Sequence, residues 1–331
     1  MASFCELPVK GTKMSIIDVR GLRQTYRAKK LTVEAVRGID FTVEAGEIVG
    51  FLGPNGAGKT TTLRMLTTLL RPTAGQAQIA GADLLQNPKG VRARIGYVAQ
   101  AGGADRNALV AEELVLQARL YGVPAREARR RASELLARLD LADLDRRVVK
   151  TLSGGQHRRL DVAIGLVHRP SLLFLDEPST GLDPQSRSNL WDHIRRLREE
   201  LGTTVFLTTH YLDEADALCD RILVIDHGQI VAEGTPEELK RRVSGDVVTI
   251  GVGDEAVAAK DVLTGQPGVR EVVAAEDSVR LTVDEGGEAV ATLMKVLDGA
   301  GVRVRSIQLH RPTLEDVFLT LTGRSLRDEA A

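Results

Sequence analysis

Residues 53–60 place the strongest constraint on what this chain can fold into. They read Gly-Pro-Asn-Gly-Ala-Gly-Lys-Thr and fit the phosphate-binding pattern G-x-x-x-x-G-K-[ST] at every position. A short apolar run, 47–52, precedes them, and a stretch with apolar residues at helical spacing, 61–70, follows. Strand, glycine-rich loop and helix in this order predict a loop whose N–H groups and helix N-terminus surround a phosphate chain. A glycine-rich turn that binds nothing is the alternative, and the flanking strand and helix count against it.

Two side chains of this loop are expected to carry its chemistry. Lys59 supplies a full charge to the β- and γ-phosphates, and the Thr60 hydroxyl is a suitable ligand for Mg²⁺. The three glycines of the loop have no Cβ, so the backbone there can take left-handed angles and approach a ligand closely. The expected nucleotide contacts of the loop, besides Lys59 and Thr60, are Gly53, Pro54, Asn55, Gly56, Ala57, Gly58 and Thr61.

Two adjacent acids follow a second apolar run, 172–175, that is typical of a strand. Asp176, at the strand end, is placed to hold Mg²⁺ through water beside Thr60. Glu177 is then placed to orient or deprotonate an attacking water. Taken alone, two acids after a strand could equally well cap the next turn. The phosphate loop in the same chain favours the chemical interpretation.

A third motif, Leu152-Ser153-Gly154-Gly155-Gln156, opens a predicted helix over 157–167. Ser153 is a good N-cap, and the paired glycines leave backbone N–H groups open to an anion. By itself this pattern also fits an ordinary capped helix start. Together with the phosphate loop and the two acids, the pattern favours an anion-binding role over an ordinary helix start.

Composition narrows the classes of partner. The net charge of −1 and the 3% of aromatic residues count against a nucleic-acid-binding surface. The two cysteines, Cys5 and Cys219, lie far apart, so neither a disulfide nor a cysteine metal site is expected. Residues 1–13 do not resemble a signal peptide, and either Met1 or Met14 could be the start. The cysteine usage indicates a cytosolic chain. It has no run of about 20 apolar residues, so we expect any membrane role to be peripheral or through a partner.

The 331 residues suffice for two domains. Segments 16–19, 32–36 and 39–43 are expected as strands, and 112–121 and 125–140 as helices. Glu127 and Glu134 flank the arginines at 129–131 at helical spacing, which predicts a solvated face with local ion pairs rather than a basic binding patch. The continuous apolar runs 172–175 and 205–207 suit central strands of a largely parallel sheet, and 226–229 suits a hairpin turn.

After residue 242 the predicted order of elements changes to β-α-β-β-α-β, followed by a last helix over 313–322. This is the order of a ferredoxin-like split βαβ unit. We therefore expect an N-terminal tail (1–13), an ATPase domain (14–243) with a helical subdomain at about 101–150, a small α+β accessory domain (246–325) and a C-terminal tail (326–331).

Together the motifs resemble those of the ATPase subunit of ATP-binding cassette (ABC) transporters. In that family's terms they are Walker A (53–60), the Q-loop glutamine Gln100, the signature (152–156), Walker B (172–177), the D-loop (179–183, ending at Asp183) and the switch histidine His210. Tyr26 falls where the family usually has an aromatic residue that stacks on adenine. His157 departs from the usual pattern after the signature, and we expect it to be exposed and of little consequence.

The resemblance implies an α/β P-loop ABC cassette: a mixed, largely parallel sheet with antiparallel β-structure and a helical subdomain. It also implies that two chains pack head to tail, with ATP held between Walker A of one and Ser153, Gly154, Gly155 and Gln156 of the other. Glu177 would be the general base, and His210 would contact the γ-phosphate and the attacking water. Gln100 would join Thr60 and Asp176 at the Mg²⁺, and Asp183 would complete the nucleotide site.

The partners follow from the same resemblance. They are separate transmembrane permease subunits, met through the helical region 101–150, and a second copy of the chain. The permease would meet the small-molecule substrate, and the chain would sit at the cytoplasmic face of the cell membrane. No nucleic-acid partner is expected.

The segments 311–319, 192–212 and 233–236 resemble drug- and antibiotic-export ATPases of the daunorubicin-resistance type. They favour export of a drug-like small molecule. The alternatives for the whole chain are an importer ATPase or an ABC ATPase that acts on ribosomes or DNA. For the C-terminal domain, a role only in regulation or dimerisation is as well supported as a direct role in export. A neighbouring gene for a protein with about six membrane helices would favour the exporter.

Overall fold

A computed structural model describes residues 15–28, 31–243 and 245–323. The chain divides into two compact units, Met1–Glu233 and Gly234–Ala331. The division falls before the helix at 236–243, whereas the expected ATPase domain extends to residue 243. The expected tails, 1–13 and 326–331, lie outside the described residues, as does Cys5, while Cys219 is a free, buried thiol.

The central sheet of the first unit positions all the chemical motifs. Its strand order is β10-β9-β3-β8-β7-β6, and the strands from β9 to β6 run parallel. β3, β7 and β8 are buried along their whole length, as the continuous apolar runs predict. The bounds are β3 (Ile48–Leu52), β6 (Ile95–Val98), β7 (Leu172–Asp176), β8 (Thr204–Thr209), β9 (Arg221–Asp226) and β10 (Gln229–Gly234).

The turn between β9 and β10 is the predicted hairpin turn. Its two central residues, His227 and Gly228, both have positive φ, of 46° and 76°. Two left-handed residues in succession are typical of the type I′ turn that matches the twist of a hairpin.

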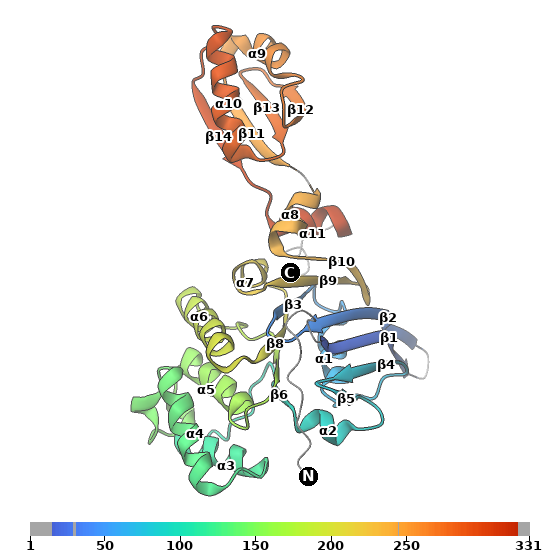
Figure 1. Ribbon diagram of the computed structural model, residues 1–331, viewed down its shortest axis with the longest axis vertical. Helices are drawn as coiled ribbons and strands as arrows, with labels where there is room; N and C mark the ends of the chain where they lie inside the picture. The colour runs from blue at the N-terminus through green and yellow to red at the C-terminus, as the bar shows by residue number, and fades with distance from the viewer. Residues whose placement is uncertain (1–14, 29–30, 244, 324–331) are drawn as a thin grey trace, which may run out of the picture. The chain divides into compact units, whose positions relative to one another are not determined.

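A second, antiparallel sheet packs beside the first and has the order β2-β1-β4-β5 (Figure 1). Its strands are β1 (Ser15–Ala28), β2 (Leu31–Glu44), β4 (Ala74–Ile79) and β5 (Ala82–Asp83). The sequence predicts separate strands at 32–36 and 39–43, but β2 spans both. Gly38, at φ 87°, sits at a register shift between them, so the chain accommodates a bulge instead of ending the strand.

Helices cover the central sheet and form the predicted helical region. They are α1 (Lys59–Leu66), α2 (Pro88–Arg92), α3 (Val110–Leu120), α4 (Ala125–Arg138), α5 (Gly154–Leu166), α6 (Pro184–Leu201) and α7 (Leu212–Leu218). Figure 1 shows α3, α4 and α5 gathered in one group away from the antiparallel sheet. On α4, Arg130 pairs with Glu127 and Glu134, and Arg131 with Glu127, so the arginine cluster is the predicted ion-paired face.

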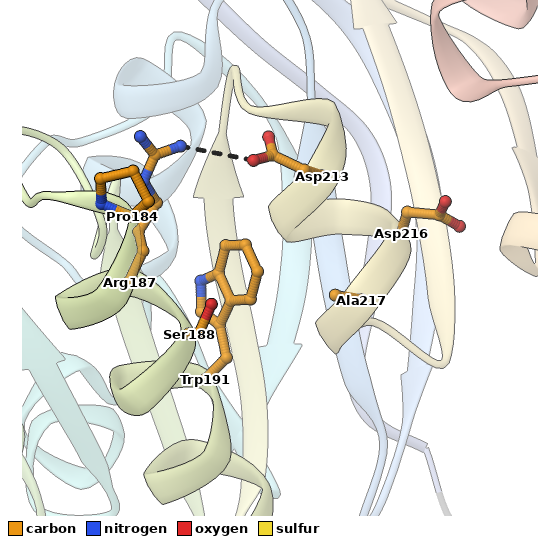
Figure 2. Close-up of a pocket in the computed structure, with 7 residues that line it drawn as sticks. All are labelled: Pro184, Arg187, Ser188, Trp191, Asp213, Asp216 and Ala217. Atoms are coloured by element: carbon orange, nitrogen blue, oxygen red, sulfur yellow. Dashed lines mark hydrogen bonds and ion pairs between the residues drawn. The ribbon is translucent and has the colours of Figure 1, made fainter.

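A cavity of about 480 Å³ opens between α6 and α7. Figure 2 shows its lining, where the Arg187 guanidinium reaches toward Asp213, 3.4 Å away, and the Trp191 indole lies below them. One wall of this cavity is therefore the ring of the chain's only tryptophan.

Four phenylalanine rings fix the centre of the first unit. Phe206 on β8 lies with its centroid 5.7–5.8 Å from the rings of Phe41, Phe51 and Phe174. All four side chains are buried, and they join strands from both sheets. Because Phe206 touches all three of the others, it binds the two sheets and the site-bearing strands into one core.

The second unit has the predicted ferredoxin-like order. Its sheet runs β12-β13-β11-β14, and every neighbouring pair is antiparallel. The alternate residues of β11 and β13, such as Val248 and Leu281, pack into a core with α9 and α10. The elements are α8 (Pro236–Val243), β11 (Asp246–Gly251), α9 (Ala256–Leu263), β12 (Val269–Ala274), β13 (Ser278–Val283), α10 (Gly286–Gly299), β14 (Ser306–His310) and α11 (Leu314–Thr322).

Within residues 15–28, 31–243 and 245–323, no helix is both long enough and apolar enough to cross a bilayer.

Removal of the central ring should destabilise the first unit strongly. We expect Phe206→Ala to lower its free energy of unfolding by about 4 kcal/mol, because a large cavity opens among three rings. Urea unfolding followed by the fluorescence of Trp191, the chain's single tryptophan, measures this unit specifically. The control is Val231→Ala on β10, a position 41% exposed, which should change stability by only about 0.5 kcal/mol. Equal effects of the two variants would contradict the assigned core.

Candidate functional site

The phosphate loop connects the end of β3 to the start of α1. Gly58 has φ 108°, and a Cβ there would lie 2.5 Å from the Ala35 carbonyl oxygen. Only glycine avoids both the left-handed strain and the collision. The loop conformation that the sequence pattern requires is therefore present, with the first turn of α1 directly behind it.

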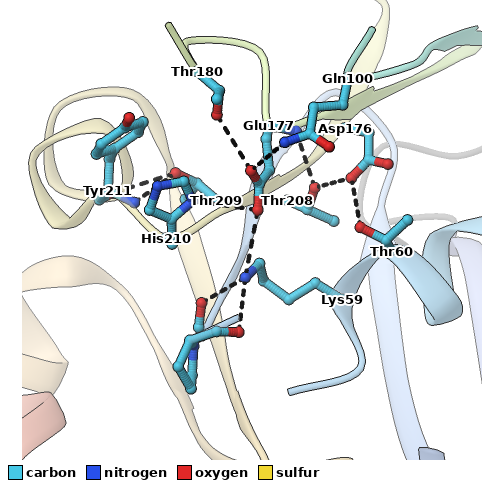
Figure 3. Close-up of polar contacts among 12 residues, drawn as sticks. Lys59, Thr60, Gln100, Asp176, Glu177, Thr180, Thr208, Thr209, His210 and Tyr211 are labelled. Carbon is cyan, nitrogen blue, oxygen red and sulfur yellow. Dashed lines mark hydrogen bonds and ion pairs between the residues drawn. The ribbon is translucent and has the colours of Figure 1, made fainter. Parts of the chain in front are cut away.

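The Lys59 side chain lies across its own loop. Its Nζ donates to the carbonyl oxygens of Gly53, at 2.7 Å, and Pro54, at 2.9 Å. It also lies 3.6 Å from Glu177 Oε1, and the side chain is only 4% exposed. Figure 3 shows the ammonium group between the loop and this carboxylate. A buried cation at the mouth of the loop supplies the charge that a phosphate chain requires.

Thr60 and Asp176 come together from α1 and from the end of β7. The Thr60 hydroxyl donates to Asp176 Oδ1 at 3.2 Å, and Thr208 Oγ1 donates to the same oxygen at 2.7 Å. Hydroxyl and carboxylate oxygens are the hard donors that Mg²⁺ takes, and it keeps several waters besides. The donor set at this point of the structure therefore fits Mg²⁺.

Glu177 is held by side chains from four segments (Figure 3). His210 Nδ1 lies 3.2 Å from Oε1, on the same side as Lys59. Gln100 Nε2 donates to Oε2 at 3.0 Å, and Thr180 Oγ1 donates to it at 3.2 Å. The two carboxylate oxygens thus have separate sets of partners, which fixes the plane of the carboxyl group.

The electrostatics and the backbone at Glu177 are both unusual. Burial raises the pKa of its carboxyl group, but the hydrogen bond to His210 and the charge of Lys59 outweigh burial and hold the pKa below its usual value. The residue therefore stays a carboxylate at neutral pH. Its φ of 45° is left-handed, a strained conformation for a residue that is not glycine and one that concentrates at functional sites.

Other predicted site residues lie apart from this cluster within the single chain. Ser153 caps α5 by accepting from the Gln156 N–H, and Gln156 Oε1 accepts from the Ser153 N–H in return. Gly154 and Gly155 lie at the same helix start, and a Cβ on either would face the segment around Leu182 and Ser186. Asp183 likewise bonds Ser186 and caps α6.

Tyr26 lies close to the phosphate loop. Its hydroxyl is 3.5 Å from Thr61 Oγ1, and 42% of the residue is exposed. An exposed ring beside the first turn of α1 leaves a face open to a planar ligand.

Sequence reasoning missed Arg158, one turn into α5. Its buried guanidinium donates to the carbonyl oxygens of Pro178 and Ala99, both at 2.7 Å, and of Asp176 at 3.0 Å. It thereby joins the residues after β6 to those after β7. No sequence pattern marks this role, because the acceptors are backbone oxygens that every residue possesses.

Sequence reasoning also missed Thr180 and Thr208, which hold Glu177 and Asp176. Thr208 Oγ1 accepts from the Glu177 N–H at 3.1 Å as well as donating to Asp176. The available signal was position: Thr208 is the next-to-last residue of β8, the strand beside β7, and lies directly opposite Asp176 in the parallel ladder.

The exposure of His157 differs from what the sequence predicts. We expect it to be exposed, but its side chain is only 28% exposed, and its Nδ1 lies 3.2 Å from Asp161 Oδ2. The partner is one turn along α5, and Asp161 Oδ1 also accepts from the Gly103 N–H at 3.2 Å. His157 is therefore packed against a carboxylate that fastens the segment after Gln100.

The geometry defines an ATPase of the P-loop class, and the comparisons with known proteins identify its family. The ABC transporter family profile matches residues 36–180, and that of the ATP-binding protein DrrA1-3-like C-terminal domain matches residues 234–322. Solved structures agree in fold: a dimeric ATP-binding cassette, MJ0796, in a post-hydrolysis state with ADP and Pi matches with TM-score 0.61 and 25% identity. That match covers 66% of this chain and 98% of that one.

Relatives align over nearly the whole chain. The daunorubicin resistance ATP-binding protein DrrA3 of Streptomyces coeruleorubidus is 44% identical over 95% of this chain and 98% of its own length. The doxorubicin resistance ATP-binding protein DrrA of Mycobacterium tuberculosis (strain ATCC 25618 / H37Rv) is 42% identical over 95% of both. A Nod factor export ATP-binding protein I of Ralstonia nicotianae is 40% identical, again over 95% of both.

The chain therefore belongs to the family of ABC transporter ATP-binding proteins, and it is an ATP-binding, ATP-hydrolysing subunit. Within that family its sequence is of the daunorubicin- and doxorubicin-resistance type, which the match of its C-terminal domain supports independently.

The His157–Asp161 pair predicts a pH-dependent contribution to stability. The hydrogen bond to Asp161 raises the pKa of His157 above its usual value, against the opposing effect of burial. The contribution is therefore complete below the unfolded-state pKa of about 6.5 and is lost as pH rises through the folded-state pKa. We expect the stabilisation of the native chain relative to His157→Gln to be largest at about pH 5.5 and to fall to a constant value as pH rises through the raised pKa of His157.

Urea titrations at a series of pH values measure this difference. As a control, His157→Gln made in an Asp161→Asn background should show no such pH dependence. A difference that is constant with pH, or that grows as pH rises, would contradict the pairing.

Proposed function

We propose that Glu177 is the general base of ATP hydrolysis in this chain. Support comes from the arrangement of its carboxylate, which Gln100, Thr180, His210 and Lys59 hold in one plane beside the phosphate loop. With its pKa held down, it is unprotonated and able to take a proton from a water. His210, on the same carboxylate oxygen as Lys59, is proposed to contact the γ-phosphate and the attacking water.

The remaining roles follow from position around the phosphate loop. We assign the backbone of 53–58 and the side chains of Lys59 and Thr61 to the phosphates, and the ring of Tyr26 to the adenine. Thr60 and Asp176 would hold Mg²⁺, with Gln100 nearby, and the ion when bound neutralises phosphate charge. Its donor oxygens already lie within 3.2 Å of each other.

We also infer that the working unit is a head-to-tail pair of chains. The signature residues Ser153–Gln156 form an open helix N-terminus, which suits an anion, yet their hydrogen bonds within the chain stay at that helix start. ATP on the phosphate loop of one chain would meet Ser153, Gly154, Gly155 and Gln156 of the other. Asp183, at the N-cap of α6, would lie at the same junction.

Replacement of Glu177 tests the proposed base. We expect Glu177→Gln to lower kcat for ATP hydrolysis by roughly 10²- to 10⁴-fold, because the amide cannot accept the proton. ATP binding, measured by calorimetry, should persist, since the phosphate loop is unaltered. The matched control, Glu199→Gln on the exposed face of α6, should keep native turnover. Normal turnover by Glu177→Gln would contradict the assignment of Glu177 as the general base.

We propose further that hydrolysis powers export of an amphipathic, drug-like molecule through separate permease subunits. The named relatives are resistance and export proteins, which favours export over the import, ribosome and DNA alternatives. The chain would then sit at the cytoplasmic face of the membrane, attached through the helical region 101–150. Substrate choice would belong to the permease.

Transport in vesicles tests this part of the proposal. Inverted membrane vesicles that contain this chain and a permease that co-purifies with it should accumulate daunorubicin or doxorubicin when ATP is added, as measured by drug fluorescence. Vesicles with Glu177→Gln supply the control and should accumulate none. An active ATPase whose vesicles accumulate neither drug would contradict the drug-export proposal and leave the hydrolysis mechanism standing.

A further inference from the structure

A buried carboxyl group without a role in the site described above lies behind the two loops that flank Glu177. Glu214, on α7, has no exposed surface. Its Oε1 accepts from the Ser179 hydroxyl and, at 3.0 Å, from Trp191 Nε1. Burial raises the pKa of this carboxyl group, and the Ser179, Thr209 and Trp191 side chains act in the opposite direction. Buried ionisable groups are costly, so this one requires an explanation.

The contacts of Glu214 lead to both loops that hold Glu177. Ser179 immediately precedes Thr180, whose hydroxyl donates to Glu177 Oε2. Thr209 immediately precedes His210, which lies against Glu177 Oε1. A single carboxyl group thus fastens the residues next to two of the four groups that orient the proposed base.

The rest of the network makes this fastening rigid. The Trp191 indole donates to Ser179 Oγ at 2.9 Å as well as to Glu214, so the three side chains close a ring of hydrogen bonds. Ser179 and Thr209 are fully buried. The Thr209 carbonyl accepts from the Gly53 N–H at 3.3 Å, which continues the connection to the phosphate loop. Buried polar groups that are paired in this way, as Ser179, Trp191 and Glu214 Oε1 are, specify one geometry.

We propose that Glu214 is a positioning residue for ATP hydrolysis. It holds the Ser179–Thr180 and Thr209–His210 segments at a fixed separation, so that Thr180 contacts Oε2 of Glu177 and His210 contacts Oε1. Without Glu214 the carboxylate plane of Glu177 loses its alignment, while the phosphate loop still binds ATP. The inference rests on the proposed role of Glu177.

Steady-state ATPase kinetics of Glu214→Ala and Glu214→Gln test the proposal. We expect Glu214→Ala to lower kcat about tenfold or more with KM for ATP little changed, since misplacement of a reacting group affects the chemical step. Glu214→Gln keeps an oxygen that accepts from Ser179 and Trp191, so it should restore most of kcat. Asp216→Asn, an exposed position on the same helix, should behave as the native chain.

Thermal unfolding followed by Trp191 fluorescence separates positioning from a structural role. A Glu214→Ala chain that melts earlier but has native kcat per folded molecule would overturn the proposal. If Glu214→Ala does not fold, Ser179→Ala removes the partner hydroxyl instead. The expected result is the same loss of kcat, and native kcat in that variant would overturn the proposal equally.

A double-variant cycle tests whether Glu214 acts through Glu177. In a Glu177→Gln background, Glu214→Ala should cause no further loss of turnover, whereas an independent effect would multiply and overturn the proposal. The two hypotheses fail separately. Full activity of Glu177→Gln would contradict the proposed role of Glu177 as the base. An inactive Glu177→Gln together with a fully active Glu214→Ala would contradict only the positioning role of Glu214.

Discussion

The parallel alignment of β3, β7 and β8 is the constraint on which the whole site depends. Because the three strands run in the same direction, their carboxyl ends meet at one edge of the sheet. That edge receives the phosphate loop from β3, the two acids that end and follow β7, and His210, which follows β8. The ring of Phe206, packed against Phe51 and Phe174, fixes these strands together from within.

Around that edge the chain arranges polar contacts so that one carboxylate has a defined orientation. Glu177 takes a strained left-handed backbone, which the Thr208 carbonyl and hydroxyl oxygens stabilise by accepting from its N–H. Arg158 ties the carbonyl oxygens after β6 and β7 together from behind. Strain at one residue persists because the surrounding contacts determine it. The buried polar network therefore fixes the orientation of the carboxylate that we propose as the base.

The phosphate loop, the parallel sheet and the second unit could be predicted from the sequence, because some motifs require particular residue types. The glycines and Lys59 are irreplaceable for geometric and electrostatic reasons, so their pattern located the loop and, with the flanking apolar run, the parallel sheet. The β-α-β-β-α-β order likewise predicted the second unit. The joining of two short segments into β2 was not visible, because a glycine that forms a bulge resembles one that ends a strand.

The supporting contacts could not be predicted for a different reason. Arg158 binds backbone oxygens, and Glu214 binds Ser179 and Trp191, which lie 35 and 23 residues away in sequence. Such pairings depend on the packing of α5, α6 and α7 against the sheet, not on local spacing. His157 illustrates the same limit: its partner was at helical spacing, but its burial depended on the segment after Gln100.

The central claim is that Glu177 acts on ATP held between the phosphate loop of one chain and the signature of another. A structure of the Glu177→Gln protein with Mg²⁺ and ATP tests it most directly. We predict two chains with two nucleotides, each γ-phosphate contacting Lys59 of one chain and Ser153 of the other, with residue 177 facing it. A nucleotide fully enclosed by a single chain, or one placed away from Lys59, would contradict it.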